Sequence, residues 1–361
     1  MQRHLNQETQ PFREMPVFNN WNVVAKGWYV ACPSRDLKKH KVKSVDICGQ
    51  RVVVFRGDDG RVRALDAYCP HMGADLGQGK VIGNNIRCFF HHWSFNGDGQ
   101  CAHIPCLQEG QKIPPAAKLH SYATEERYGL VWVFPEKVAP HAVVTPPDHE
   151  NEEIFFRLGK AFRRPCHYHV NLLNGVDPQH LNTVHQVPIE KHGIQAVESG
   201  DGVLEFTFRS EHLGRNWKER VAKFLLGEND EFRVRYGDGC IACLSILRTA
   251  QLFGSTIKLP SLNMIYAYKT VGLEGVSEVQ PIFLTKKRKG VWGFLLNRFL
   301  VWVMKRIFLA LKDQDTNVLE TIRFQPKFMF SVDEPILQFM GYINALEPSV
   351  WSRAQSSQSN R

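Results

Sequence analysis

The feature that most constrains this chain is a pair of short segments that each carry one cysteine and one histidine. They read Cys69-Pro-His71 and Cys88-Phe-Phe-His91, with sixteen residues between them. Thiolates and imidazoles are good ligands for zinc and iron, and two short loops can enclose a metal centre from opposite sides. We therefore expect a fold that places these two loops face to face.

Two metal centres compete for these four side chains. Two cysteines and two histidines can hold zinc tetrahedrally, but zinc motifs usually space Cys with Cys and His with His. Here each segment supplies one of each, which would place both thiolates on one iron of a [2Fe–2S] cluster and both imidazoles on the other. Neutral imidazoles in place of two thiolates raise the reduction potential to roughly −150 to +300 mV, from about −400 mV.

The segment from 21 to 134 shows the pattern of a small antiparallel β-domain. Arg51–Phe55 is mostly apolar and β-branched, as in a strand. The turn residues Gly57–Gly60 follow, and Arg61–Leu65 has the pattern of a returning strand, so together they predict a hairpin. Beyond a Pro-, His- and acid-rich stretch at 135–153, helix and strand patterns mix. Alternation predicts strands at 203–208 and 232–236, and the period and length of 291–325 predict a helix.

A second group of candidate ligands follows in the string Asp177-x-x-His180-x-x-x-x-His185. On its own this pattern is weak, because such a string is usually a capped helix with incidental histidines. Asn174 precedes it, and Pro178 either kinks a helix or occupies its first position behind an Asp177 cap.

Together, the two groups resemble the motifs of Rieske non-heme iron ring-hydroxylating oxygenases, over roughly residues 21–345. Cys69-Pro-His-Met-Gly and Cys88-Phe-Phe-His-His-Trp93 resemble the Rieske loops of the terminal oxygenase α subunit. Two residues depart from the family, with Phe89 where proline is common and His92 where glycine is common. The spacing favours His91 as the ligand, and His92 is expected at the surface.

The resemblance implies a role for each candidate residue. His180 and His185 would bind a mononuclear Fe(II) together with a carboxylate from a distant helix, a donor set that leaves positions open for O₂. Asp315, followed by Val318-Leu319-Glu320, fits the family pattern better than Asp313 does. Asp177 would bridge an iron-binding histidine to a cluster histidine of the neighbouring subunit, with Asn174 near the iron.

The resemblance also implies an α+β fold, assembly and partners. An N-terminal antiparallel β Rieske domain would precede a helix-grip (Bet v1-like) catalytic domain. The expected divisions are an arm (1–20), the Rieske domain (21–140), a linker (141–152), the catalytic domain (153–350) and a disordered tail (351–361). The length resembles members that form homotrimers. No Gly-rich dinucleotide fingerprint occurs, so we expect a separate ferredoxin or reductase as the electron donor.

The expected activity is that of a monooxygenase acting on a small apolar organic molecule, by hydroxylation or oxidative demethylation. The alternatives are an electron-transfer protein and a membrane-associated Rieske protein without oxygenase activity. A net charge of +9 suits an acidic electron carrier, an anionic membrane or an acidic substrate, and no nucleic-acid-binding module is recognisable.

Location is predicted from the N-terminus and from one helix. Residues 1–12 are polar and lack the apolar stretch of a secretory signal, so a reducing cytoplasm is expected. In 291–311, Arg298 and Lys305 begin a basic stripe that recurs every seven residues and continues to Lys312. A helix packed into the core is the favoured interpretation, and a helix lying on a membrane surface is the alternative.

Overall fold

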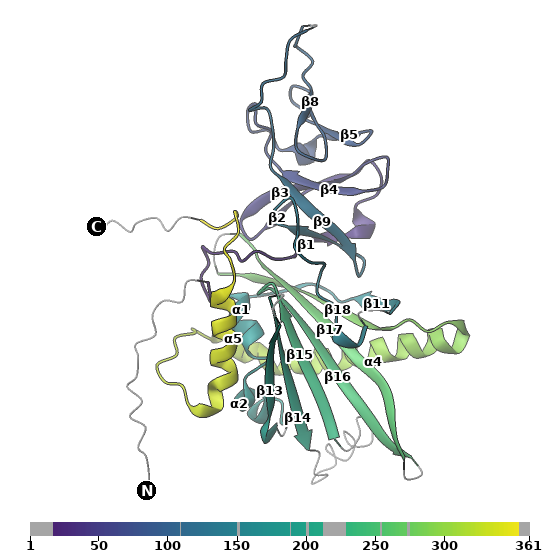
Figure 1. Ribbon diagram of the computed structural model, residues 1–361, viewed down its shortest axis with the longest axis vertical. Helices are drawn as coiled ribbons and strands as arrows, with labels where there is room; N and C mark the ends of the chain where they lie inside the picture. The colour runs from purple at the N-terminus through teal and green to yellow at the C-terminus, as the bar shows by residue number, and fades with distance from the viewer. Residues whose placement is uncertain are drawn as a thin grey trace.

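The computed structural model of the chain describes residues 17–353, apart from 109, 150–151, 188, 200–201, 212–228, 253–254 and 273–274. Most of the expected arm (1–20) and of the expected tail (351–361) therefore lies outside the described residues. The described chain contains three antiparallel sheets, and Figure 1 shows the largest of them packed on one long helix.

The first sheet has six strands in the order β1-β10-β9-β4-β3-β2. Its strands are β1 (Tyr29–Pro33), β2 (Val42–Ile47), β3 (Gln50–Arg56), β4 (Val62–Asp66), β9 (Ser121–Arg127) and β10 (Leu130–Phe134). β3 and β4 form the predicted hairpin, with Val53 paired opposite Leu65 and both side chains fully buried. β-branched and aromatic side chains favour this pleated, half-buried setting.

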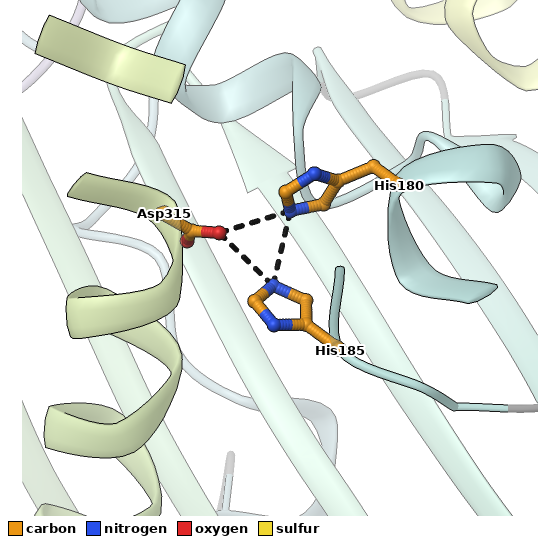
Figure 2. Close-up of side chains that lie close together, drawn as sticks. All are labelled: His180, His185 and Asp315. Carbon is orange, nitrogen blue, oxygen red and sulfur yellow. Dashed lines mark hydrogen bonds and ion pairs between the residues drawn. The ribbon is translucent and has the colours of Figure 1, made fainter. Parts of the chain in front are cut away.

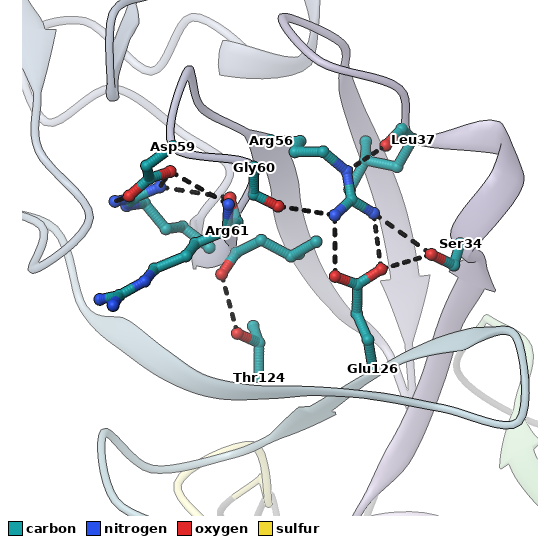
Figure 3. Close-up of polar contacts among 10 residues, drawn as sticks. Ser34, Leu37, Arg56, Asp59, Gly60, Arg61, Thr124 and Glu126 are labelled. Atoms are coloured by element: carbon teal, nitrogen blue, oxygen red, sulfur yellow. Dashed lines mark hydrogen bonds and ion pairs between the residues drawn. The ribbon is translucent and has the colours of Figure 1, made fainter.

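A polar network ties β3 to β9 across the intervening β4 (Figure 3). The two terminal nitrogens of Arg56 donate to the two carboxylate oxygens of Glu126 at 2.6 and 2.8 Å, and Arg56 Nε donates to the carbonyl oxygen of Leu37 at 2.6 Å. Thr124 Oγ1 donates to the carbonyl oxygen of Val62 at 2.9 Å. A bidentate guanidinium–carboxylate pair fixes geometry, so this network holds the sheet beneath the ligand loops rigid.

The second sheet carries the cysteine/histidine loops. Its four strands are β5 (Lys80–Ile82), β6 (Asn85–Arg87), β7 (Ser94–Phe95) and β8 (Cys101–His103). Leu76, Ile86 and Phe95 are fully buried and pack in one cluster with Cys69 and Cys88. The two thiols are therefore part of a small hydrophobic core.

The third sheet forms most of the C-terminal part. Its order is β11-β18-β17-β16-β15-β14-β13, and β12 also pairs with β18. The strands are β11 (Ile154–Leu158), β12 (Phe162–Arg164), β13 (Ile189–Ser199), β14 (Val203–Glu211), β15 (Asn229–Gly237), β16 (Ile241–Leu252), β17 (Ser255–Thr270) and β18 (Ser277–Lys286). The strands predicted at 203–208 and 232–236 fall inside β14 and β15.

Helices cover one face of this sheet (Figure 1). They are α1 (Tyr168–Leu173), α2 (Pro178–Thr183), α4 (Gly290–Thr321) and α5 (Glu334–Ala345), with 3₁₀ turns η1 (Ser34–Asp36), η2 (Leu76–Gln78), η3 (Pro147–His149) and η4 (Ser331–Asp333). Leu300, Met304 and Phe308 of α4 are buried against Met264 and Phe283 of the sheet. No helix in the described part of the chain is long and apolar enough to cross a membrane.

One continuous core joins the first and third sheets. It contains Trp132 of β10 and Ile265 of β17, both fully buried. The backbone N–H of Trp28 donates to Asp238 Oδ2 at 3.0 Å, and Lys269 Nζ donates to the carbonyl oxygen of Val30 at 3.1 Å. The predicted α+β class, with an antiparallel β-domain before a sheet packed on a long helix, is confirmed.

Candidate metal centres and substrate cavity

Helix α2 begins at a tight cap that orients the first histidine of the second motif. Asp177 Oδ1 accepts hydrogen bonds from the backbone N–H groups of Gln179 and His180, at 2.9 and 3.0 Å. Pro178 occupies the first helical position, where no N–H is needed. The structure therefore has the capped helix, and the alternative of a proline kink inside a helix is wrong.

The two histidines of this motif point to the same place. His180 lies within α2, and His185 follows its C-terminal end. Their Nε2 atoms are 3.0 Å apart. His185 Nδ1 lies 2.7 Å from Gln314 Oε1, which can only accept, so Nδ1 carries a proton and Nε2 is the nitrogen left to bind a metal. Gln314 thus fixes His185 in the tautomer that a metal ligand needs.

Asp315 on α4 completes the group from the opposite side, as Figure 2 shows. Its Oδ1 lies 3.0 Å from His180 Nε2 and 3.1 Å from His185 Nε2. Asp313 points away: its side chain is 76% exposed and lies 3.7 Å from Lys312 Nζ. The structure brings the predicted residue of the two, Asp315, to the histidines.

The three atoms form a nearly equilateral triangle that suits one metal ion. Ligand atoms about 2.1 Å from a metal and at right angles to each other lie about 3 Å apart, as on one face of an octahedron. The side chains of His180, His185 and Asp315 are 7%, 6% and 19% exposed, so little water reaches their lone pairs. This two-histidine, one-carboxylate set fits Fe(II) with open positions.

The charge on Asp315 also suits a cation. Burial raises the pKa of this carboxyl, but hydrogen bonding to His180 and His185 outweighs burial and holds the pKa below its ordinary value. Burial lowers the pKa of His185, whereas bonding to Asp315 and Gln314 raises it above its ordinary value. A divalent cation bound between them would stabilise this close approach of a buried carboxylate and two imidazoles.

A cavity of about 280 Å³ adjoins this triangle. Most of its wall is aliphatic or aromatic, and it includes Leu172, Val234, Leu244, Phe308 and Leu311. Such a wall binds apolar molecules through the hydrophobic effect and through van der Waals contacts. Because His180, His185 and Asp315 also line the cavity, a bound molecule would lie beside the metal position.

A few polar groups interrupt the apolar wall, and the sequence singled out only one of them. Asn174 caps the end of α1, and its Nδ2 is buried without a hydrogen-bond partner among the described residues. Tyr268 Oη donates to Asn171 Oδ1 at 3.2 Å. Arg164 is 3% exposed, and it donates from Nη2 to the carbonyl oxygen of Lys312 at 3.1 Å. An arginine at the end of an ordinary-looking strand gives no sequence signal for this position.

The four candidate ligands of the first motif divide into a buried and an exposed pair. Cys69 and Cys88 are 3% and 2% exposed. Burial raises the pKa of the Cys69 thiol to about 11, and its interaction with the Cys88 thiol contributes. Such thiols bind as thiolates only when a metal compensates their charge.

The imidazoles lie together at the exposed edge. His71 Nδ1 and His91 Nδ1 are 3.1 Å apart, and His71 stacks on Trp93 with ring centroids 4.6 Å apart. His91, not His92, faces His71. Two thiols on the buried side and two imidazoles on the outer side are the arrangement that a cluster with one Cys₂ iron and one His₂ iron requires.

Asp177 does not reach the cluster loops of its own chain. Its partners are backbone groups of α2, whereas His71 and His91 lie in loops next to the strands of the small sheet, which Figure 1 shows beyond the first sheet. The bridging role that the sequence predicts for Asp177 thus needs the cluster of another subunit.

Comparison with known proteins agrees with this description. Residues 27–123 match the family described as Rieske [2Fe-2S] domain, and this segment contains all four loop ligands. The chain therefore carries a Rieske domain, whose cofactor is the [2Fe–2S] cluster. The Rieske domain that the loop motifs indicate is confirmed.

The chain is also similar to curated oxidative enzymes over part of its length. It is 33% identical to aminopyrrolnitrin oxygenase of Pseudomonas fluorescens over 192 residues, covering 51% of this chain and 52% of that protein. It is 36% identical to a cholesterol 7-desaturase of Bombyx mori over 163 residues, covering 44% of this chain and 35% of that protein. The chain thus spans about a third to a half of the length of these relatives.

A solved structure extends the likeness to the whole architecture. Dicamba monooxygenase bound to dicamba superimposes with a TM-score of 0.63 at 19% identity, covering 90% of this chain and 98% of that chain. At this identity the match shows a shared fold.

Proposed function

We propose that this chain is the oxygenase component of a Rieske non-heme iron monooxygenase. Electrons would pass from the [2Fe–2S] cluster to a mononuclear Fe(II), and an apolar organic substrate would be hydroxylated or oxidatively demethylated with O₂. The convergence of His180, His185 and Asp315 beside an apolar cavity carries this proposal. A protein that only transferred electrons would need neither the second donor set nor the cavity.

Iron bound by these three residues would supply a redox centre with open positions for O₂. The chain's own residues do the remaining work. Gln314 holds His185 in its ligand tautomer, and Leu244 and Phe308 bind the substrate and exclude water. Asn174, with Nδ2 lacking an acceptor among the described residues, is placed to donate to a bound polar group.

The proposed assembly is a homotrimer in which each cluster serves the iron of the next subunit. Asp177 Oδ1 is occupied by two backbone N–H groups, whereas Oδ2 has no partner among the described residues. It would accept from an imidazole of the neighbouring subunit, and His91 is exposed enough to reach it. Tyr68, Met72, Phe89 and Phe90 are more than half exposed around the cluster, which suits a contact between subunits.

Partners and location complete the proposal. A separate ferredoxin or reductase, or both, would supply electrons, and the chain would divide at 140 and 153 into a Rieske domain, a linker and a catalytic domain. All nine cysteines are free, which fits a reducing cytoplasm. Peripheral contact with a membrane surface would be made through α4.

Metal analysis of the purified protein tests the core of the proposal. An oxygenase should hold about three irons and two acid-labile sulfides per chain, whereas a plain electron carrier should hold about two irons. The reduced protein should give a Rieske-type EPR spectrum that Cys69→Ser and Cys88→Ser both abolish. A reductant-consumption screen over aromatic, alkaloid and sterol-like compounds would then identify the substrate class. Stoichiometric zinc without iron or sulfide would overturn the proposal.

A further inference from the structure

Helix α4 exposes a row of large apolar side chains on its N-terminal half. Trp292, Leu295, Leu296, Phe299 and Trp302 follow the i, i+3, i+4, i+7 spacing of one helix face, which we call the outer face of α4. Trp292 is 85% exposed, Phe299 57% and Trp302 54%. Single exposed apolar residues are ordinary, but a contiguous row of them marks an interaction surface.

The outer face is not needed to hold the helix in place. On the opposite side of α4, Asn297, Leu300, Val301 and Met304 are at most 5% exposed, and the apolar ones pack on the sheet. A helix on the surface of a soluble protein needs only one apolar face. The sequence prediction of a core helix therefore accounts for one face and leaves the outer face unexplained.

The charged residues along the stretch that contains this face all have one sign. No aspartate or glutamate occurs from 279 to 312, whereas eight lysines and arginines do. Lys286 and Lys287 are paired with Glu152 and Glu153. The guanidinium groups of Arg298 and Arg306 instead lie over the rings of Phe294 and Trp302, each 5.6 Å from the ring centroid.

We propose that the outer face of α4 docks on an anionic lipid surface. Tryptophans with apolar neighbours favour the boundary between headgroups and acyl chains, and flanking lysines and arginines attract anionic headgroups. A second copy of the chain is a poorer occupant, because it would bring two sets of basic side chains together. The electron donor would need to reach the cluster loops of the small sheet, and the first sheet lies between that sheet and α4 (Figure 1).

The same helix links this surface to the cavity. Phe308 and Leu311 of α4 form part of the cavity wall, about 24 Å along the helix from Trp292 to Phe308. A membrane-dissolved apolar molecule would then be released close to the cavity that receives it. This consequence rests on the proposed function, whereas the docking itself rests on α4 alone.

Sedimentation of the holoprotein with vesicles tests the docking without any turnover. Vesicles of phosphatidylcholine containing phosphatidylglycerol should bind the protein, and pure phosphatidylcholine vesicles should bind it far less. The pair Arg298→Gln and Lys305→Gln should weaken binding about fivefold per charge removed. The pair Trp292→Ser and Phe299→Ser should weaken it at least about tenfold.

Matched controls separate the outer face from general apolar exposure. Phe328 and Val138 are 71% and 73% exposed outside α4, so Phe328→Ser and Val138→Ser should leave vesicle binding unchanged. Cluster EPR and thermal unfolding should be the same in all variants, since the replaced side chains are exposed. Equal binding by the outer-face variants, no binding to anionic vesicles, or self-association that Trp292→Ser abolishes would each overturn the docking. Vesicle binding by a protein without oxygenase activity would leave the docking standing and remove the proposed function instead.

Discussion

The two proposed metal sites differ in how their candidate ligands are brought together. The four cluster residues lie within Cys69–His91, on neighbouring loops of one small sheet, whereas the second site joins His180 and His185 to Asp315, more than a hundred residues later. The first depends on local turns and a small core, and the second depends on how α4 packs against the large sheet. We therefore expect changes on α4 to affect the mononuclear site and leave the cluster intact.

The largest effect expected at one site and not at the other comes from a substitution on α4. Asp315→Ala removes the only carboxylate among the three converging residues, so the protein should lose its mononuclear iron and its turnover should fall by about a thousandfold or more. The cluster, held by other strands, should keep its full EPR intensity. Iron analysis and EPR on one sample would check both statements.

Asp313→Ala is the matched control for that change. Asp313 lies two residues earlier on the same helix, but its side chain is 76% exposed. This variant should keep about three irons per chain and ordinary turnover. If the two variants exchanged phenotypes, the register of α4 at the site would be wrong.

A second experiment asks whether the sites work within one chain or across two. His91→Ala should disable the cluster and His180→Ala the iron site, each alone giving an inactive protein. Co-assembled, they should regain partial turnover, because some interfaces pair an intact cluster with an intact iron site. Verified mixed trimers without turnover would mean that electrons travel within one chain.

Asp177→Asn sharpens the same experiment. Asparagine caps a helix about as well as aspartate, so α2 and both metals should remain. The variant lacks the carboxylate charge, so turnover in the mixed trimers should fall by about ten- to a hundredfold when it is placed in the subunit that retains its iron site. Asp177→Ala should, in addition, destabilise the protein by about 1 kcal/mol through loss of the cap.

The same contrast between local and long-range ligands explains which features could be predicted from the sequence. The cluster ligands and the hairpin below them are local patterns, and the structure has the β3–β4 hairpin where the turn residues placed it. The approach of Asp315 to His180 was expected only through a family resemblance, because spacing alone relates no two residues that far apart. Asp313 and Asp315 differ by two positions, and only packing decides which one faces inward.

Other features depend on contacts that no local pattern encodes. Gln314 precedes Asp315 and has an ordinary helical setting, yet it orients His185. The outer face of α4 could not be identified from the sequence, because the helix is apolar on two opposite sides. A sequence pattern cannot say which of these sides packs on the sheet. The roles of Gln314 and Arg164 are both long-range, and both can be tested.

Gln314→Leu should weaken iron binding at the second site about tenfold. It removes the acceptor that fixes the His185 tautomer, and losing such an orienting partner typically costs ten- to a hundredfold in metal affinity. Gln314→Glu keeps an acceptor and should retain or tighten binding. Chelator competition measures both, with the cluster spectrum as an internal reference. Equal weakening in both variants would show that packing, rather than the hydrogen bond, is what matters.

The smallest effect expected comes from Arg164, which braces α4 on both sides of Asp315. Its Nη2 donates to the carbonyl oxygen of Lys312, three residues before Asp315, and to Thr316 Oγ1, one residue after it, each at 3.1 Å. Arg164→Met keeps the apolar stem but removes these donors, so the iron affinity should fall about three- to fivefold, about 1 kcal/mol. Arg163→Met is the matched control, because Arg163 is 63% exposed and paired with Glu278. The prediction fails if both variants lower the iron affinity equally, or if Arg164→Met lowers only the unfolding temperature and leaves metal binding unchanged.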